Sequence, residues 1–335
     1  MSRSRLVVLI SMAVVGVGSL AAVGAFFLDP ARAAVGPLPA EGLLLPADAR
    51  FVVGLDAKRF TASPLYKRFQ AQARPDAFRE LEERTGLDPE RDVDQILIAG
   101  QATKGAGPGL AIVLGSFDTY KLGRSIETSK DKDKVVGRTF VGYTEYVFDE
   151  TEPGRAAVAV AFLDRQALLI GRQAAVEAAL SGRANGTAPL RGNASIMGLL
   201  ERVKPGSTFW MVGDQSLLQN LPGTVPSPAG NAASIELPAL KSLIVTGDLE
   251  PVISLAITGD AADEAAAKNL ANIVSGFVSL VALQASQKPE LKDLAQAISV
   301  ATERSHVLVN ARVPYEMLEA LQPKRAAVAP PVVVQ

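Results

Sequence analysis

The hydrophobic positions of this chain fall into two kinds of pattern. Short apolar runs that end at glycine or an acidic residue, such as residues 93–100 and 109–115, predict strands. Residues 263–287 instead place apolar side chains three and four positions apart, and this spacing predicts one long helix. Its apolar stripe comprises Leu270, Ile273, Val274, Phe277, Val278 and Val281. We expect this helix to pack on a core.

The same order of elements occurs twice. In the first half we predict strands at 51–56, 93–100 and 109–115, helices at 64–85 and from Asp118, a hairpin over 156–171 and a helix at 173–180. In the second half we predict strands at 209–214, 239–247 and 252–259, a helix from near Asp260, a hairpin over 297–313 and a helix at 314–321. The separation of matched positions drifts along the chain: Asp56 to Asp214 is 158 residues, Gly100 to Gly247 is 147, and Gly171 to Ala311 is 140. Insertions in loops produce such drift. The shared order of elements and a few matched residues therefore predict an internal duplication.

The predicted fold class is α+β, with two tandem similar units of mainly antiparallel sheets, each backed by helices on one face. The predicted domains are a signal segment at 1–33, a tether at 34–45, a first repeat at 46–190, a second repeat at 191–322 and a flexible tail at 323–335. The first repeat contains an additional strand pair over 135–148. The alternative is one continuous α+β domain whose strands merely recur.

The N-terminus predicts export. Arg3 and Arg5 precede Leu6–Leu28, a run of 23 residues without a charge. As a helix this run is about 34 Å long, enough to cross a bilayer core of about 30 Å. Ala31-Arg32-Ala33 then fits a signal-peptidase site. The segment is therefore either an uncleaved anchor in the bacterial inner membrane or a signal peptide cleaved after Ala33, and both place the remaining chain in the periplasm or outside the cell.

Composition removes several kinds of chemistry. The chain has 335 residues, no cysteine and one histidine, which excludes thiol catalysis, disulfides and almost every zinc site. A net charge of −1 argues against nucleic acid as a partner. We therefore predict no cofactor and no metal. The remaining partners are the membrane, through the N-terminal helix, and an envelope protein or a lipid.

Two candidate sites contain a potential nucleophile or base. His306 lies in an alternating run, which favours an ordinary strand position over a member of a catalytic triad. Ser63 and Lys67 are four residues apart, as in a dyad, but Pro64 marks a helix start and makes Ser63 an N-cap. We therefore predict no catalytic residue.

Three further segments are better explained by structure than by function. The run 88–94 has alternating acids but lacks the glycine and glutamate that a calcium loop requires, which leaves open only an irregular calcium site. The glycine-rich run 100–109 lacks the order of a phosphate loop and predicts a hairpin loop. The run 130–134 alternates lysine and aspartate and predicts a solvated turn.

The first repeat resembles a known kind of protein. Leu45-Pro46-Ala47-Asp48 precedes a strand, Gly86-Leu87-Asp88-Pro89 follows a helix, and Asp92-Val93-Asp94 opens another strand. This arrangement resembles a loose group of uncharacterised exported bacterial proteins with an N-terminal membrane helix and a duplicated α+β ectodomain. The resemblance covers residues 43–115 and implies the architecture but no activity.

Three functions fit these observations. The first is a non-catalytic binding or scaffold protein of the cell envelope, with a groove between two similar halves. The second is a carrier of lipid or another hydrophobic ligand, which would hold an apolar cavity against the long helix. The third is a hydrolase whose carboxylate pair has no short sequence signature.

Overall fold

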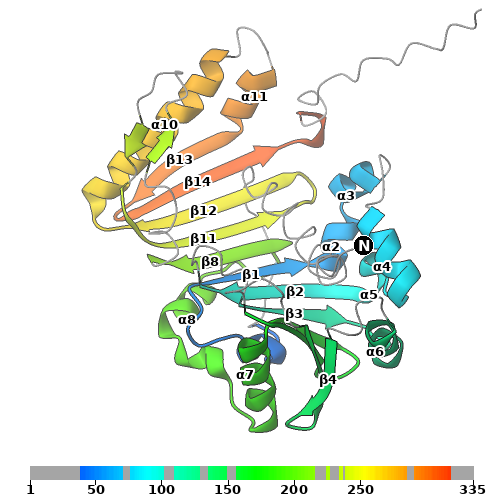
Figure 1. The fold of residues 1–335 in the computed structure, drawn as a ribbon. Helices are drawn as coiled ribbons and strands as arrows, with labels where there is room; N and C mark the ends of the chain where they lie inside the picture. Colours follow the sequence, from blue (N-terminus) through cyan, green and yellow to red (C-terminus); the bar gives the residue numbers. More distant parts are fainter. Residues whose placement is uncertain are drawn as a thin grey trace, which may run out of the picture.

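The computed structural model describes residues 38–70, 76–101, 109–128, 135–148, 156–215, 224–226, 234–236, 238–284 and 290–317. They form a mixed α+β fold around one twelve-stranded antiparallel sheet, backed by helices (Figure 1). The strand order is β13-β14-β12-β11-β8-β1-β2-β3-β7-β6-β5-β4. The expectation of one sheet for each half is therefore wrong, because strands from both sides of residue 190 pair within a single sheet.

The strands of the large sheet are β1 Phe51–Asp56, β2 Val93–Gly100, β3 Leu110–Gly115, β4 Val135–Phe140, β5 Tyr143–Phe148, β6 Val158–Phe162, β7 Ala167–Arg172, β8 Phe209–Asp214, β11 Leu240–Asp248, β12 Ile253–Ala261, β13 Ile298–Glu303 and β14 His306–Val313. A separate pair consists of β9 Thr224–Pro226 and β10 Ser234–Glu236. The helices are η1 Ala40–Leu44 and η3 Pro189–Gly192, both 3-10, and α2 Ala57–Ala62, α3 Pro64–Gln70, α4 Asp76–Thr85, α5 Pro89–Asp92, α6 Thr119–Glu127, α7 Gln173–Ala184, α8 Ala194–Leu200, α10 Glu264–Gln284 and α11 Glu290–Gln296. The predicted strands of the large sheet are confirmed to within two residues.

The centre of the sheet is the antiparallel pair β1 and β8. Val53 lies opposite Met211, and the pairing extends symmetrically to either side of them. At one end the Asp56 N–H donates to the Thr208 carbonyl at 2.8 Å, and at the other the Asp214 N–H donates to the Arg50 carbonyl at 3.0 Å. These two hydrogen bonds are related by the same offset of 158 residues that separates Asp56 from Asp214 in the sequence.

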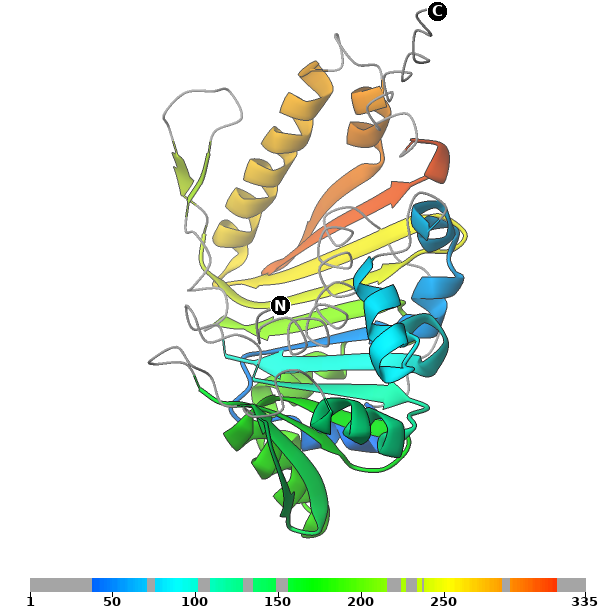
Figure 2. The same cartoon turned by 45° about the vertical axis from the view of Figure 1, so that its right-hand side comes forward.

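Helices cover both faces of the first half of the sheet. We call the side that carries Leu55 and Ile96 the first face, and the side that carries Val52 and Leu97 the second face. Helices α2, α3, α4 and α6 contribute to the core on the first face, whereas η1, α7, η3 and α8 contribute to the core on the second (Figures 1 and 2). The expectation of helices on one face is wrong here, because strands such as β3 are buried on both sides and need cover on each.

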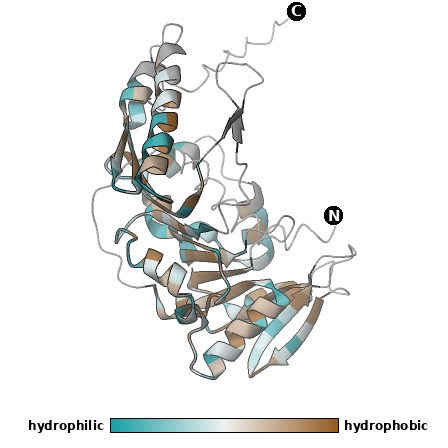
Figure 3. Cartoon of the chain, turned by 90° about the vertical axis from the view of Figure 1, so that its left-hand side faces the viewer, coloured by the Kyte–Doolittle hydropathy of each residue, from teal (hydrophilic) through white to brown (hydrophobic). Residues whose placement is uncertain are grey.

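In the second half, α10 packs on the first face of the sheet. Ala267 and Leu270 are buried with Val307 of β14, while Val274 and Phe277 farther along the helix are only half-buried. In Figure 3 the long helix accordingly has hydrophobic bands between hydrophilic ones. The helix begins at Glu264 and is capped by Asp263, whose carboxylate accepts from the Ala266 N–H at 2.8 Å.

Two expected boundaries differ in the structure. Asp260, expected at the start of this helix, lies within β12, because the strand continues to Ala261. The tether predicted at 34–45 is packed from Leu38 onward: η1 forms there, Leu44 and Leu45 are buried, and Leu38 contacts the core of the second face. The predicted signal segment 1–33 and tail 323–335 lie outside the described residues, as does the second half of the helix predicted at 314–321, whose residues 315–317 are helical. Among the residues that are described, no helix combines the length and apolarity needed to cross a membrane.

Candidate functional site

A hollow of about 660 Å³ opens on the first half of the molecule. It lies between one face of α6, the β4–β5 turn and the β6–β7 turn. The residues that line it are Thr119, Tyr120, Gly123, Arg124, Glu127, Gly142, Tyr143, Thr144, Tyr146, Phe162, Leu163, Asp164 and Arg165. Its volume falls within the range of about 300–1,000 Å³ that is usual for small-molecule sites.

Local sequence features hold α6 against this hollow. Asp118 caps the helix, since its carboxylate accepts from the Lys121 N–H at 2.9 Å. Gly123 follows on the helix face that meets β5. A Cβ at this position would lie 2.5 Å from the Tyr146 hydroxyl, so only glycine lets that phenol lie against the helix.

The β4–β5 turn on the rim has a strained backbone. Val141 has φ 42° and Gly142 has φ 88°, so both residues adopt left-handed conformations. Consecutive positive φ values are the mark of a type I′ hairpin turn, which favours Asn-Gly. A β-branched residue in this region costs about 1–2 kcal/mol. Val141 is also 48% exposed, so no burial offsets that cost. Strain of this kind clusters at functional sites.

The hollow collects tyrosines in a chain that has few. The sequence contains five, and three of them, Tyr120, Tyr143 and Tyr146, line this one site. Tyr146 is buried and meets Phe162 edge to face, with ring centroids 6.2 Å apart. Tyr120 is 76% exposed at the rim. A large aromatic side chain left so open offers a flat surface to a ligand.

The charged side chains around the hollow differ in whether they already have a partner within the protein. Glu127 accepts a hydrogen bond from the Tyr146 hydroxyl at 3.2 Å, and Asp164 accepts one from the Gln166 N–H at 2.7 Å. Within the part of the chain that the structure describes, the guanidinium groups of Arg124 and Arg165 have no hydrogen bond or ion pair. Burial, and then the charge of Glu127, raise the pKa of Tyr146, so its phenol stays protonated. Two cationic groups are therefore available to a ligand.

His306, which the sequence placed in a strand, belongs to a different cluster. Its Nδ1 lies 2.6 Å from Asp260, which also accepts two hydrogen bonds from Arg202, at 2.7 and 3.0 Å, and one from Ser242. Burial opposes ionisation of Asp260, but these hydrogen bonds outweigh it and hold its pKa far below the usual range. A catalytic triad would place histidine between serine and aspartate, whereas here the carboxylate is in the middle. The cluster ties β11, β12 and β14 to the segment after α8.

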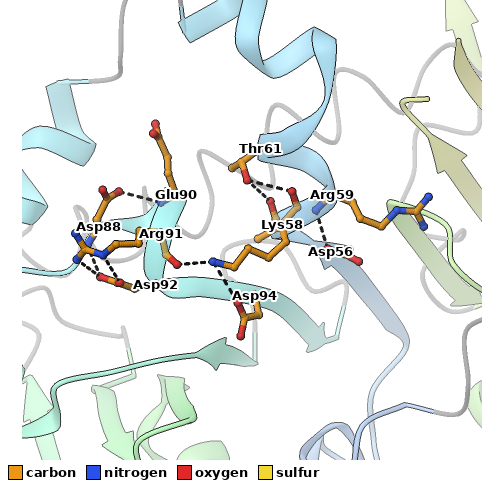
Figure 4. A network of polar contacts seen from close by, with 10 residues as sticks. Asp56, Lys58, Arg59, Thr61, Asp88, Glu90, Arg91, Asp92 and Asp94 are labelled. Carbon is orange, nitrogen blue, oxygen red and sulfur yellow. Dashed lines mark hydrogen bonds and ion pairs between the residues drawn. The ribbon is translucent and has the colours of Figure 1, made fainter. Parts of the chain in front are cut away.

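The acidic run 88–94 is used in caps and ion pairs (Figure 4). Asp88 caps α5 by accepting from the Glu90 N–H at 3.0 Å, and Asp94 pairs with Lys58 at 3.3 Å. Asp92 accepts from the Asp88 N–H and from Arg91. These bonds outweigh burial and lower its pKa. Across the described residues, no group of histidine, cysteine, aspartate or glutamate has the arrangement of a metal site.

The other candidates from the sequence are a helix cap and two runs of residues. Ser63 caps α3, because its hydroxyl accepts from the Tyr66 N–H at 3.2 Å. Most of the glycine-rich run 100–109 and all of the run 130–134 lie outside the described residues.

A carboxylate pair that the sequence did not indicate joins β4, β5 and α7. Arg138 donates to the buried Glu145 at 2.9 Å and also pairs with Glu177. Burial raises the pKa of Glu145, and its Oε1 has no partner among the described residues. The pair lines neither the hollow nor the enclosed cavity described next. A substrate in either of these spaces would therefore not reach the pair.

An enclosed apolar cavity lies between α2, α4 and the first face of the sheet. Phe78, Leu81, Ile96, Val113 and Phe117 contribute to its wall. Its volume is about 30 Å³, which is room for about one water molecule and far too little for an acyl chain.

The hollow was not predicted, although parts of it are visible in the sequence. The hairpin over 135–148 and the helix from Asp118 were both predicted. Their convergence depends on β5, β6 and β7 being neighbours in the sheet, and no local pattern specifies that order. The nearest signal was the low number of aromatic residues, which makes the grouping of three tyrosines notable.

No family model matches the chain, and no curated protein matches it. Among solved structures, crystal form I of TP0453 is similar at 11% sequence identity and a TM-score of 0.44, over 85% of this chain and 96% of that chain. A likeness of this degree identifies neither a family nor a function.

Proposed function

We propose that this chain is a non-catalytic binding protein of the bacterial cell envelope, and that the hollow beside α6 is its ligand site. The single observation that carries this proposal is the lining of the hollow: three tyrosines, and two arginines that have no acidic partner among the described residues, in a space of small-molecule size. Export rests on the apolar segment Leu6–Leu28. It would leave the folded part outside the cytoplasm, either anchored in the inner membrane or released after Ala33.

The lining groups favour binding over catalysis. Tyr146 has a raised pKa and is a weak nucleophile and a weak base at neutral pH. The carboxylates of Glu127 and Asp164 already accept hydrogen bonds from the protein. Arg124 and Arg165 remain to position an anionic group, which needs no proton transfer.

We also infer that the fold arose by duplication of one unit. The order β1-β2-β3-β7-β6 of the first half corresponds to β8-β11-β12-β14-β13 of the second. Phe51 lies opposite Gly100, and Phe209 lies opposite Gly247, at the same positions in the two halves. Because β4 and β5 have no counterpart among the described strands of the second half, the hollow belongs to the first half only, as expected of a function acquired after duplication.

A carrier of hydrophobic ligands is the second candidate, favoured by one observation. The apolar stripe of α10 is only half-buried at Ile273, Val274, Phe277 and Val278. The enclosed cavity lends this candidate no support, because it is too small and lies on the other half of the molecule.

Native mass spectrometry of the full chain, extracted from its host membrane in mild detergent, tests the proposal. We expect a small-molecule adduct on the wild type that is lost in Tyr120→Ala. The matched control is Val136→Ala, which removes another exposed apolar side chain, 59% exposed, that does not line the hollow. An adduct that survives Tyr120→Ala would place binding elsewhere, and an adduct that organic extraction identifies as lipid would favour the carrier.

Export has its own test. Protease added to intact spheroplasts should digest residues 34–335 while the N-terminal segment stays with the membrane. Full protection of the chain in intact spheroplasts, with digestion after lysis, would contradict an extracytoplasmic location.

A further inference from the structure

We propose that the hollow binds an anionic sugar: a sugar ring that carries a carboxylate or a phosphate. This inference rests on the proposed function and adds the class of ligand.

The flat surfaces suit a ring. Tyr120 is exposed at the rim, Tyr143 is half-buried on the wall, and Tyr146 is buried beneath them. Aromatic faces bind the apolar face of a ring, while tyrosine hydroxyls and the side chains of Thr119 and Thr144 can exchange hydrogen bonds with ring hydroxyls. An acyl chain would leave these polar groups without partners, which costs free energy.

The hydrogen bonding of the charged lining residues favours an anionic ligand. The lining contains two arginines and two acids, so a count alone predicts no preference. The acids, however, already bind internal donors, whereas the guanidinium groups of Arg124 and Arg165 bind nothing among the described residues. A planar guanidinium matches carboxylate and phosphate oxygens in pairs. The two guanidinium groups are therefore free to bind a ligand, whereas one oxygen of each carboxylate is already engaged by the protein.

The alternative to an anionic ligand is a cationic one. Three tyrosines could form an aromatic cage of the kind that binds quaternary ammonium groups. Two arginines on the rim of the same hollow would repel such a ligand. An anion gains from the arginines and still stacks on the tyrosines, so both sets of groups contribute.

The site also has a fixed rim. The β4–β5 turn places Gly142 and Tyr143 at the edge of the hollow, and Val141 beside them holds a left-handed backbone at an energetic cost. The Cβ-free Gly123 fixes Tyr146 on the other side. The three tyrosines are thus held by a capped helix and a hairpin rather than by free loops.

Isothermal titration of the full chain in detergent micelles tests the inference. The probes are glucuronate, glucose 6-phosphate, uncharged glucose and inorganic phosphate alone. We expect glucuronate or glucose 6-phosphate to bind at least tenfold more tightly than both glucose and inorganic phosphate. The stronger of the two shows whether the carboxylate or the phosphate is the natural group.

Variants assign the effect to the arginines. Arg124→Gln and Arg165→Gln should each weaken binding of the better anionic sugar by about tenfold, the usual size of a hydrogen bond to a charged group, and leave the weak binding of glucose unchanged. The matched control Arg183→Gln, at an exposed arginine on α7 that does not line the hollow, should bind as the wild type does. Thermal unfolding of all three confirms that each exposed change leaves the fold intact.

The outcomes separate the two levels of the proposal. Equal binding of glucose and the anionic sugars, unaffected by either arginine variant, would overturn the anionic class but retain the hollow as a sugar site. Anion binding that Arg183→Gln weakens as much as Arg124→Gln would indicate nonspecific attraction and also overturn it. If no sugar binds while the adduct seen by mass spectrometry still depends on Tyr120, the ligand class is wrong and the binding function stands.

Discussion

At the scale of single residues, glycines and aromatic rings that face each other across strands organise the centre of the sheet. Gly54 of β1 lies opposite Trp210 of β8, and a Cβ at residue 54 would lie 2.2 Å from the indole ring. Gly247 of β11 lies opposite Phe209 in the same way, with its Cβ position 2.1 Å from the ring. A ring that covers a glycine fills the space that the missing side chain leaves and fixes the register of the pair.

Gly54→Ala should therefore destabilise the protein by about 1–3 kcal/mol, because the backbone must move to admit the methyl group. Urea unfolding followed by the fluorescence of Trp210, the single tryptophan, measures both the stability and the altered surroundings of the indole. The control is Gly198→Ala on α8, where a Cβ meets nothing within 4 Å and helix propensity predicts a gain of about 1 kcal/mol. Equal effects of the two changes would contradict the packing described for Gly54.

Asp260 links stability to pH. Its pKa is lower in the folded chain than the ordinary value of about 3.9, so the folded state binds fewer protons than the unfolded state in acid. The contribution of Asp260 is complete above the unfolded pKa and is lost as pH falls through the folded one. Asp260→Asn should cost about 2 kcal/mol at pH 7, because Arg202 loses its charged partner.

The same variant should flatten the loss of stability below about pH 4, and urea titrations at pH 7, 5, 4 and 3 measure this slope. Glu303→Gln, an exposed acid on β13, is the control. A wild-type curve no steeper than that of Asp260→Asn would show that the hydrogen bonds of Asp260 do not persist in solution.

At the scale of elements, the β4–β5 hairpin combines a strained turn with a buried charge. Its edge strand β4 is tied inward through Arg138 to Glu145, while its turn holds Val141 at φ 42°. Val141→Asn supplies the Asn-Gly pair that this turn favours and should raise stability by about 1 kcal/mol. Thermal unfolding measures this gain. A loss of stability would mean that the turn is not of this type.

Sequence reasoning succeeded where the determinants of an element are local. The start of α6 follows from Asp118 as a cap and the end of α4 from Gly86, whose φ of 71° suits glycine. It failed where two elements compete for the same residues, as at Asp260, which can cap a helix but here lies within β12. The helices on the second face could also have been predicted. Residues 110–115 are apolar without alternation, and a strand of this kind is buried on both sides and needs cover on each.

At the scale of the whole molecule, the two halves share one sheet through β1 and β8. The register is symmetric around Val53 and Met211, so β1 pairs with β8 as it would pair with a second copy of itself. A chain of residues 34–190 should therefore dimerise through β1, since an unpaired central edge is a template for an equivalent strand. Sedimentation velocity measures its mass. A stable monomer over a range of concentrations would contradict this equivalence of β1 and β8.

The arrangement of the whole sheet explains why the candidate site could not be predicted from the sequence. The hollow forms where α6 meets strands that are separated from it by up to about forty residues, and its tyrosines lie in two elements, Tyr120 in α6 and Tyr143 and Tyr146 in β5. Their types were visible in the sequence, but their meeting place is set by the strand order of the sheet.

The most direct test of the account is ¹⁹F NMR of the full chain labelled with fluorotyrosine, because the five tyrosines divide between the hollow and the rest of the core. Single Tyr→Phe variants assign the five resonances. On addition of the anionic sugar that binds best, the resonances of Tyr120, Tyr143 and Tyr146 should shift together and saturate, while those of Tyr66 and Tyr315, which line another part of the core, should stay in place. Shifts of Tyr66 and Tyr315 without the other three, or no saturable shift of Tyr120, Tyr143 and Tyr146 with any tested ligand, would contradict the hollow as the binding site.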